Sequence, residues 1–404
     1  MTSSTHAHEI TPSTRQAIFL LSFATFSSMA VQRICDPMLP ELSRIFEAPM
    51  GEVAQVISLF AVTYGVMQLF YGPVGDRWGK YRVVQLATLM CSIGCVLSAL
   101  STNLQFLIIA RVLTALCAAA IIPLSMAWVG DVVHYQNRQE NLAKVGLGTM
   151  LGITAGQLVG GMVTDSLGWR WAFVLMALVF SGVSLRLWLQ LRRRELPPQH
   201  PHVSVGFFKQ LYQVGADPWA RTLLGVAFLE GASMFGLLAV TPTHLHQTHH
   251  MSLTMAGSTA ALFGLGGMAY MATAKQTIRR FGEVGLAKYG GLALGLSFLL
   301  VAFSPWWPVA IPACFVGGFG FAMFHNTMQA KATQMVPTAR ATGVTLFAGF
   351  LFLGQSVGVL LLASLISHMA SMWVIGADAI FTAVLGAYFA SAIAKRNATQ
   401  ADHA

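Results

Sequence analysis

The chain has 404 residues, of which 55% are hydrophobic and 10% are charged, and its formal net charge is +9. Soluble globular proteins carry about 25% charged residues, so this composition excludes an ordinary soluble domain and indicates a chain that lies mostly in a lipid bilayer. The basic residues recur in short clusters between apolar runs and form no patch or stripe, which argues against nucleic-acid binding.

Long apolar runs follow one another along the chain, each close to the ~20 residues that a helix needs to cross a bilayer. Residues 53–71 and 83–100, for example, contain no Asp, Glu, Lys or Arg. The sequence therefore predicts an all-α membrane protein with twelve transmembrane helices, at residues 16–36, 53–71, 83–101, 104–129, 142–164, 170–191, 221–241, 255–274, 286–304, 308–330, 342–366 and 373–394.

The distribution of basic residues predicts the orientation of these spans. With the N-terminus inside, all Lys and Arg residues except Arg33, Arg44, Arg111 and Arg170 fall on the cytoplasmic side or at the inner ends of spans. Short cytoplasmic loops of membrane proteins carry such an excess of Lys and Arg. We therefore expect both termini in the cytoplasm.

A polar stretch at residues 192–218 separates two groups of six spans. It contains the basic run Arg192-Arg193-Arg194 and four prolines, and we interpret it as a cytoplasmic linker. The predicted parts are an N-terminal six-helix bundle, residues 1–191, and a C-terminal six-helix bundle, residues 219–404. An amphipathic piece at 207–212 is expected to lie along the membrane surface.

Residues 72–82, between the second and third spans, form what we interpret as a short polar turn. Five of them match, in order, the pattern G-x-x-x-D-R-x-G-[RK]-[RK]: Gly72, Asp76, Arg77, Gly79 and Lys80. The chain thus resembles the major facilitator superfamily, which has this pattern between its second and third helices. A solvated hairpin whose charges only fix orientation is the alternative interpretation.

The resemblance implies two six-helix pseudo-repeat bundles with a substrate cavity between them near the midplane of the membrane. Residues 279–282 repeat the pattern of residues 76–79 weakly, as expected for such halves. The resemblance also implies a gating loop in which Asp76 pairs with Lys80, close to Asp131 at the inner end of the fourth span. It places the chain in a bacterial cytoplasmic (inner) membrane.

The fifth span contains glycines at intervals of four, Gly148, Gly152, Gly156 and Gly160, which predict close helix packing. Residues 155–161 of this span resemble the G-P-x-x-G-G motif of proton-driven exporters in the superfamily, with Gln157 in place of the proline. Residues 110–115 in the fourth span resemble a second motif, R-x-x-Q-G, in degraded form.

Ionisable residues inside spans are expensive in a bilayer and therefore mark candidate functional sites. Arg33 and Asp36 lie near the outer end of the first span, and Arg111 lies in the outer half of the fourth. Asp36 can pair with Arg33 or with Arg111, either as a structural ion pair or as a proton-exchanging carboxylate. The resemblance to multidrug/proton antiporters, which carry an acid and an arginine at the matching places, favours Asp36 and Arg111 as the proton-coupling pair.

Glu230 in the seventh span has no basic residue within four positions, so we expect it to contribute to proton coupling or to substrate recognition, favouring cationic compounds. A satisfied core acid is the alternative. The further candidates for the substrate cavity are Arg33, Gln157, His325 and Asn326.

The remaining motifs predict neither a metal nor a cofactor. His244, His246, His249 and His250 are expected on an outer loop with no acid or cysteine nearby, so we interpret them as part of a polar loop and assign no metal there. The alternative is one metal ion held by His246 and His250, whose i, i+4 spacing suits this if the piece is helical. No nucleotide-binding motif follows a strand, and no nucleophile–base arrangement gathers in the spans, which argues against an enzyme.

These observations predict a monomeric secondary active transporter that exports small organic or drug-like molecules in exchange for protons. The alternative within transport is a dedicated transporter of one metabolite, such as a sugar, a siderophore or an amino acid derivative. The alternative of another class is a transport-inactive membrane sensor or scaffold.

Overall fold

The computed structural model describes residues 11–193, 207–336 and 340–402, which form helices and short turns without a strand. The elements are α1 (Pro12–Arg33), η1 (Asp36–Met38), α2 (Leu39–Phe46), α3 (Met50–Val53), α4 (Gln55–Trp78), α5 (Lys80–Ala99), α6 (Leu104–Ala118), α7 (Ile121–Val132), α8 (Tyr135–Leu167), α9 (Trp169–Arg192), α10 (Phe207–Ala216), α11 (Pro218–His249), α12 (Leu253–Phe303), η2 (Trp307–Val309), α13 (Ala310–Ala332), α14 (Arg340–Leu365) and α15 (Ser371–Asp402).

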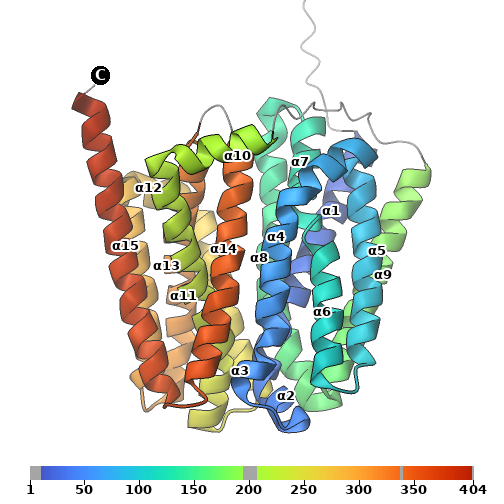
Figure 1. The fold of residues 1–404 in the computed structure, drawn as a ribbon, viewed down its shortest axis with the longest axis vertical. Helices are drawn as coiled ribbons and strands as arrows, with labels where there is room; N and C mark the ends of the chain where they lie inside the picture. The colour runs from blue at the N-terminus through green and yellow to red at the C-terminus, as the bar shows by residue number, and fades with distance from the viewer. Residues whose placement is uncertain (1–10, 194–206, 337–339, 403–404) are drawn as a thin grey trace, which may run out of the picture.

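The long helices stand side by side, with α1 and α4–α9 on one side and α11–α15 on the other (Figure 1). The short helix α10 crosses the end of the molecule at which the C-terminus lies, and it contains the amphipathic piece predicted at 207–212. The predicted linker falls partly outside the described residues. The domain boundaries at 191 and 219 stay a prediction.

Eleven helical segments of the described residues are long and apolar enough to cross a membrane. The predicted eighth and ninth spans lie within one of them, the 51-residue helix α12, in which Gly282 has a non-helical backbone with φ 60°. Positive φ is a conformation that glycine adopts without steric cost, so the chain bends there and continues as a second helical rod. The fold is thus an all-α membrane fold, consistent with twelve spans.

Two predicted boundaries were wrong. We expected residues 72–82 to form a turn, but α4 continues as a helix through Trp78 and only Gly79, with φ 88°, breaks it. We also expected the seventh span to end at residue 241 and the histidines to follow on a loop. Instead α11 runs through Pro242 to His249, so three of the four histidines belong to the helix.

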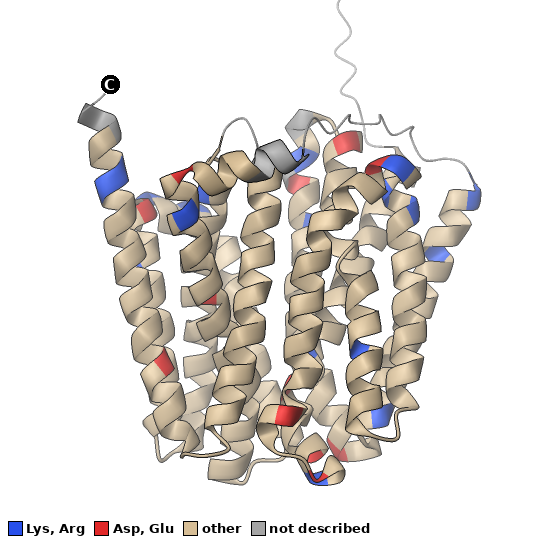
Figure 2. Cartoon of the chain, viewed as in Figure 1, with Lys and Arg blue, Asp and Glu red and all other residues tan. Residues whose placement is uncertain are grey.

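Lys and Arg gather at the end of the molecule that carries α10 and the C-terminus, as Figure 2 shows. The lateral surface of the long helices is nearly free of charge in the same view. This segregation is what the positive-inside rule leads one to expect of the cytoplasmic end.

The glycines of α8 fit against the backbone of α1 in a constant register. A Cβ added to any of them would meet a backbone carbonyl oxygen of α1 or of its C-cap residue, Ile34: Gly148 faces Ser22, Gly152 faces Phe26, Gly156 faces Ala30 and Gly160 faces Ile34. Small residues allow this close approach of helices in membranes. The predicted close packing is confirmed, and it fixes the end of α1 against α8.

The two groups of helices contact each other along α8–α12 and α4–α14. At the middle of the molecule, Gly65 of α4 lies against Phe352 of α14. Toward the end opposite α10, Asp165 of α8 accepts hydrogen bonds from the backbone nitrogen (2.5 Å) and hydroxyl (2.6 Å) of Thr254, at the start of α12. A carboxylate is favoured at a helix N-terminus, so this contact stabilises the closure of that end.

Candidate functional site

A buried polar network begins where the first helix ends. α1 stops at Arg33, and Pro37 lies in the following 3₁₀ turn, which places Asp36 at the start of that turn. Asp36 and Arg33 are both fully buried, and an Nη atom of Arg33 lies 3.5 Å from Oδ2 of Asp36. Gln157 of α8 donates a 2.7 Å hydrogen bond to the same oxygen. Its position next to Asp36 follows from the α1–α8 glycine register.

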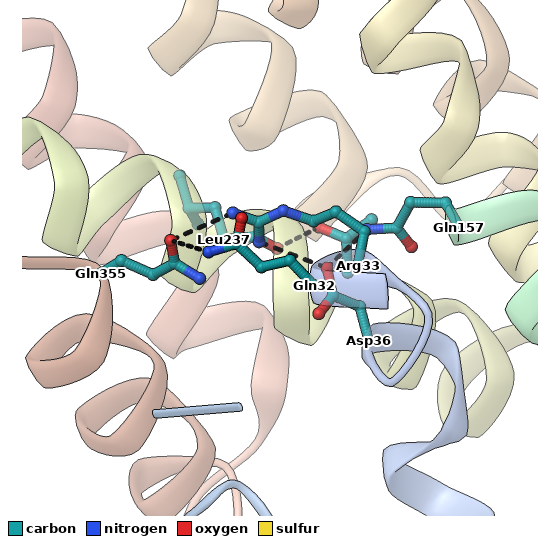
Figure 3. Close-up of polar contacts among 7 residues, drawn as sticks. Gln32, Arg33, Asp36, Gln157, Leu237 and Gln355 are labelled. Atoms are coloured by element: carbon teal, nitrogen blue, oxygen red, sulfur yellow. Dashed lines mark hydrogen bonds and ion pairs between the residues drawn. The ribbon is translucent and has the colours of Figure 1, made fainter. Parts of the chain in front are cut away.

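The network extends from the first group of helices into the second. Figure 3 shows the guanidinium of Arg33 between Asp36 and Gln355 of α14. Arg33 donates to Oε1 of Gln355 at 3.1 Å, and Gln32 donates to the same oxygen at 3.4 Å. The guanidinium also lies 4.2 Å from the ring centroid of Phe235 of α11, a distance at which cation–π attraction applies. Arg33 therefore joins the two halves of the molecule.

Several polar atoms of this network have no hydrogen-bond partner among the described residues. They are Oδ1 of Asp36, Nε of Arg33, Oε1 of Gln32, Oε1 of Gln157 and Nε2 of Gln355. An unsatisfied buried polar atom costs about 1–3 kcal/mol, so most proteins avoid such a cluster. The network therefore keeps hydrogen-bonding capacity that the described residues leave unused in this conformer.

Arg111 does not pair with Asp36 in this structure. Its guanidinium donates to the backbone oxygen of Val31 at 2.8 Å and of Val56 at 3.4 Å, and it lies 4.2 Å from the ring centroid of Phe60. The arginine thus ties α6 to α1 and α4. Of the two partners that the sequence left open for Asp36, the structure has Arg33.

A second buried ionisable pair lies in the other half of the molecule. Glu230 of α11 is fully buried, and its Oε2 lies 3.0 Å from Nδ1 of His325 of α13. The sequence named both residues but gave no reason to join them. Asn326, next along α13, is half-buried and makes no hydrogen bond that the structure describes.

Of the five residues that match the loop motif, three take part in a contact or a turn and two are exposed. The amino group of Lys80 contacts Asp76 at 2.9 Å and Asp131 of α7 at 2.6 Å, as the spacing and the resemblance predicted. Gly79 provides the turn that brings Lys80 back toward Asp76. Gly72 and Arg77 are exposed instead.

The weak internal repeat corresponds to a repeated ion pair with reversed charges. Gly282 has the same role as Gly79, since both have positive φ between two helical rods. The residue after Gly79 is Lys80, which pairs with Asp131 at the end of α7. The residue after Gly282 is Glu283, which pairs at 2.5 Å with Lys331 at the end of α13.

The histidines near the end of α11 take part in local contacts. His244 is buried and contacts Ser371 at 2.8 Å and the backbone oxygen of Val301 at 3.2 Å. His246 contacts the backbone oxygen of Met251 at 2.6 Å. No group of three His, Cys, Asp or Glu side chains in the described part of the chain is placed to hold a metal ion.

Sequence reasoning missed Gln355, Gln32 and Phe235. Gln355 has a signal that could have been used, because an amide inside the predicted eleventh span is a polar group in the bilayer. Phe235 carries no such signal, since it is one of 26 phenylalanines in the chain.

Comparison with known proteins decides the family. The model of the Major Facilitator Superfamily matches residues 21–359. The chain belongs to the Major Facilitator Superfamily. It is therefore a membrane transporter and not an enzyme, in agreement with the structures that resemble it.

Relatives in the superfamily carry several functional names. An uncharacterised transporter of Bacillus subtilis, YwfA, is 26% identical over 72% of this chain and 70% of its own length. A probable sugar efflux transporter of Pasteurella multocida is 21% identical over 91% of this chain and 90% of its own. EmrY of Escherichia coli, a probable multidrug resistance protein, is 29% identical over 44% of this chain and 35% of its own.

Solved structures show the same fold. A bacterial homolog of the human lysosomal transporter Spinster, inward-facing and occupied, superposes with a TM-score of 0.78 at 16% identity, covering 95% of this chain and 98% of that one. The human organic anion transporter MFSD10 superposes with a TM-score of 0.70 at 19% identity, covering 94% of this chain and 100% of that one.

Proposed function

We propose that this superfamily member is a proton-coupled exporter of small organic, drug-like compounds, acting as a monomer in a bacterial cytoplasmic membrane. The observation that carries the proposal is the fully buried Arg33–Asp36 pair, which reaches across the two halves through Gln355. A titratable carboxylate at such a contact links its protonation to the relative position of the halves.

The chemistry of the pair supplies the coupling. Arginine stays protonated under all physiological conditions, so only Asp36 changes charge. When Asp36 takes up a proton, Arg33 loses its counter-ion and its remaining contacts are Gln355 and Phe235. The conformer that holds the ionised pair is then disfavoured. Proton and substrate bias one equilibrium, so each affects the binding of the other.

The direction of opening follows from the contacts between the halves. They extend from Gly65 and Phe352 at the middle to Asp165 and Thr254 at the end opposite α10. If α10 is cytoplasmic, this conformer is closed toward the outside, in keeping with its similarity to an inward-facing structure.

A dedicated exporter of sugars is the second candidate. The side-chain amides of Gln32, Gln157 and Gln355 leave three buried polar atoms without a partner, and amides suit the hydroxyl groups of a sugar. The probable sugar efflux transporter of Pasteurella multocida, which aligns along most of the chain, also favours it.

One reconstitution experiment separates the two candidates. The purified chain in proteoliposomes is given an imposed proton gradient, and uptake of drug-like cations, neutral drugs and mono- and disaccharides is compared with uptake after the gradient is collapsed. We expect gradient-dependent accumulation of drug-like compounds. Accumulation of sugars alone would select the second candidate, and accumulation of none of these compounds would contradict both.

The proposed orientation, with both termini in the cytoplasm, rests on the charge distribution of Figure 2. Single cysteines at Thr248 and Thr399, both exposed, mark the two ends in a background without the native cysteines. On intact cells an impermeant thiol reagent should label Thr248→Cys and not Thr399→Cys. The reverse labelling pattern would contradict the proposed orientation.

We propose further that the Asp76–Lys80–Asp131 cluster is a cytoplasmic gate. In Asp76→Asn, Lys80 keeps Asp131 but loses one of its two carboxylates, so we expect transport to slow about tenfold while substrate binding and expression stay near normal. Arg82→Gln is the matched control, because Arg82 lies close to Lys80 in the chain, is exposed and is not one of the five motif residues. Transport by Asp76→Asn at the wild-type rate would show that the cluster is only structural.

A further inference from the structure

The Glu230–His325 pair has features of a ligand site in addition to those of an ion pair. One carboxylate oxygen, Oε2, contacts His325, whereas Oε1 is buried without a hydrogen-bond partner. His325 is not sealed off, since 14% of its side chain remains accessible. An acceptor oxygen with free lone pairs next to an accessible imidazole suits a donor or a cation.

Aromatic rings surround this pair and extend it toward Arg33. The imidazole of His325 stacks on Phe321 with ring centroids 5.0 Å apart. The ring centroid of Phe347, on α14, lies 5.6 Å from that of the imidazole. Phe321 in turn packs against Phe235, the ring that Arg33 covers. Aromatic faces attract cations, so these rings favour positive charge beside Glu230.

The other charged groups nearby have partners of their own. Asp378 of α15 accepts a 2.7 Å hydrogen bond from Ser233, and Glu283 of α12 pairs with Lys331 of α13. Helix α14 contains no ionisable residue between 341 and 365. On η1, Asp36 pairs with Arg33. His244, also on α11, contacts Ser371 and Val301 at the far end of the helix.

The charge at this site is therefore set by Glu230 and His325. When both ring nitrogens of His325 carry a proton, the imidazole is positively charged and balances the negative charge of the Glu230 carboxylate. A second positive charge in the same buried place would have no counter-ion, and an uncompensated buried charge costs several kcal/mol. Histidine is the side chain that most readily gains or loses a proton near neutral pH.

We propose that Glu230 and His325 form an exchange site in which an aromatic organic cation and a proton replace each other. As the cation binds to Glu230 between the aromatic rings, the doubly protonated imidazole of His325 releases one proton to water and keeps the other. The net charge of the site is the same before and after. This inference rests on the proposed export function and adds a proton site distinct from Asp36.

Binding without any gradient tests the exchange. The full-length chain in nanodiscs is titrated with three permanently charged aromatic cations, tetraphenylphosphonium, ethidium and benzyltrimethylammonium, between pH 5.5 and 8.5. Displacement of one proton per cation makes the affinity rise with pH by up to about tenfold per unit. We expect this slope in the wild type, with release of one proton per bound cation. His325→Arg keeps a positive charge that releases no proton, so it should bind the cations at least about tenfold more weakly than the wild type at pH 8.5, and without a pH slope.

The carboxylate and the controls complete the test. Glu230→Gln should weaken binding at pH 8.5 by at least about tenfold, whereas Asp378→Asn, which removes another mostly buried acid from the same half, should bind as the wild type does. The inference is overturned by a pH-independent wild type, by wild-type affinity and slope in His325→Arg, by full affinity in Glu230→Gln, or by a wild type that binds none of the three cations. Loss of gradient-driven transport with this binding intact would contradict the export function alone.

Discussion

Asp36→Asn is expected to abolish accumulation of substrate against its gradient, with at least a tenfold loss, while downhill exchange across the same liposomes stays within about threefold of the wild type. The substitution keeps the shape of the side chain but removes the carboxyl group that binds and releases a proton. Arg33 then faces a neutral amide at all pH values, so the proton no longer distinguishes the two conformers. Parallel assays of gradient-driven uptake and counterflow measure the two quantities.

The two arginines identify the partner of Asp36. Arg33→Lys removes the planar fork that contacts Asp36 and Gln355 together, so we expect it to shift the pH at which transport saturates. Arg111→Lys should weaken folding more than coupling, because Arg111 donates to backbone oxygens of two other helices. The reverse result would make Arg111 the proton-responsive arginine, as the family resemblance suggested.

Asp378→Asn serves as the matched control for Asp36→Asn, since it also removes a carboxylate from a helix but leaves the Arg33 network untouched. It should retain gradient-driven accumulation. If Asp36→Asn still accumulates substrate, the Arg33–Asp36 pair is structural and Glu230 becomes the leading proton carrier.

Gly156→Leu is expected to have the largest effect on stability. A Cβ at this position would lie 2.6 Å from the backbone oxygen of Ala30 and 2.8 Å from the Cβ of Arg33, so α8 and α1 must separate. Overpacking costs about 1–3 kcal/mol and sometimes more. Because Gln157 follows directly, the separation also withdraws the amide that donates to Asp36. We expect loss of gradient-driven transport and a lower melting temperature.

Gly146→Leu on the same helix is the control, because nothing lies within 4 Å of a Cβ built there. Thermal unfolding of the purified variants in one detergent, together with transport by the fraction that remains folded, separates stability from function. A Gly156→Leu protein that is as stable and active as Gly146→Leu would show that the α1–α8 contact tolerates a larger side chain at residue 156.

Much of the architecture followed from the sequence because the bilayer imposes simple rules. A run of about 20 apolar residues has to be helical, since its backbone groups find no other partners in lipid. Local spacing also sufficed for the contact between Asp76 and Lys80, which lie one helical turn apart. The glycines of α8 predicted a close helix–helix contact, although they did not indicate which helix would pack against α8.

Other features depended on which helix faces lie together. Glu230 and His325 are 95 positions apart, and Arg33 and Gln355 are 322 apart, so no local pattern connects them. Helix ends were also misread: the polar composition at Gly72–Trp78 indicated a turn, but a helix leaving the bilayer keeps its own hydrogen bonds and can continue into water.

The choice of Arg33 over Arg111 as partner of Asp36 shows most clearly what only the tertiary structure decided. Both arginines are buried and both were plausible from the sequence. Packing of α6 against α4 directs Arg111 to the backbone oxygens of Val31 and Val56, and only Arg33 remains to contact the carboxylate. A long side chain in an apolar interior takes the nearest acceptors, and the positions of those acceptors are set by helix packing, which a single sequence does not specify.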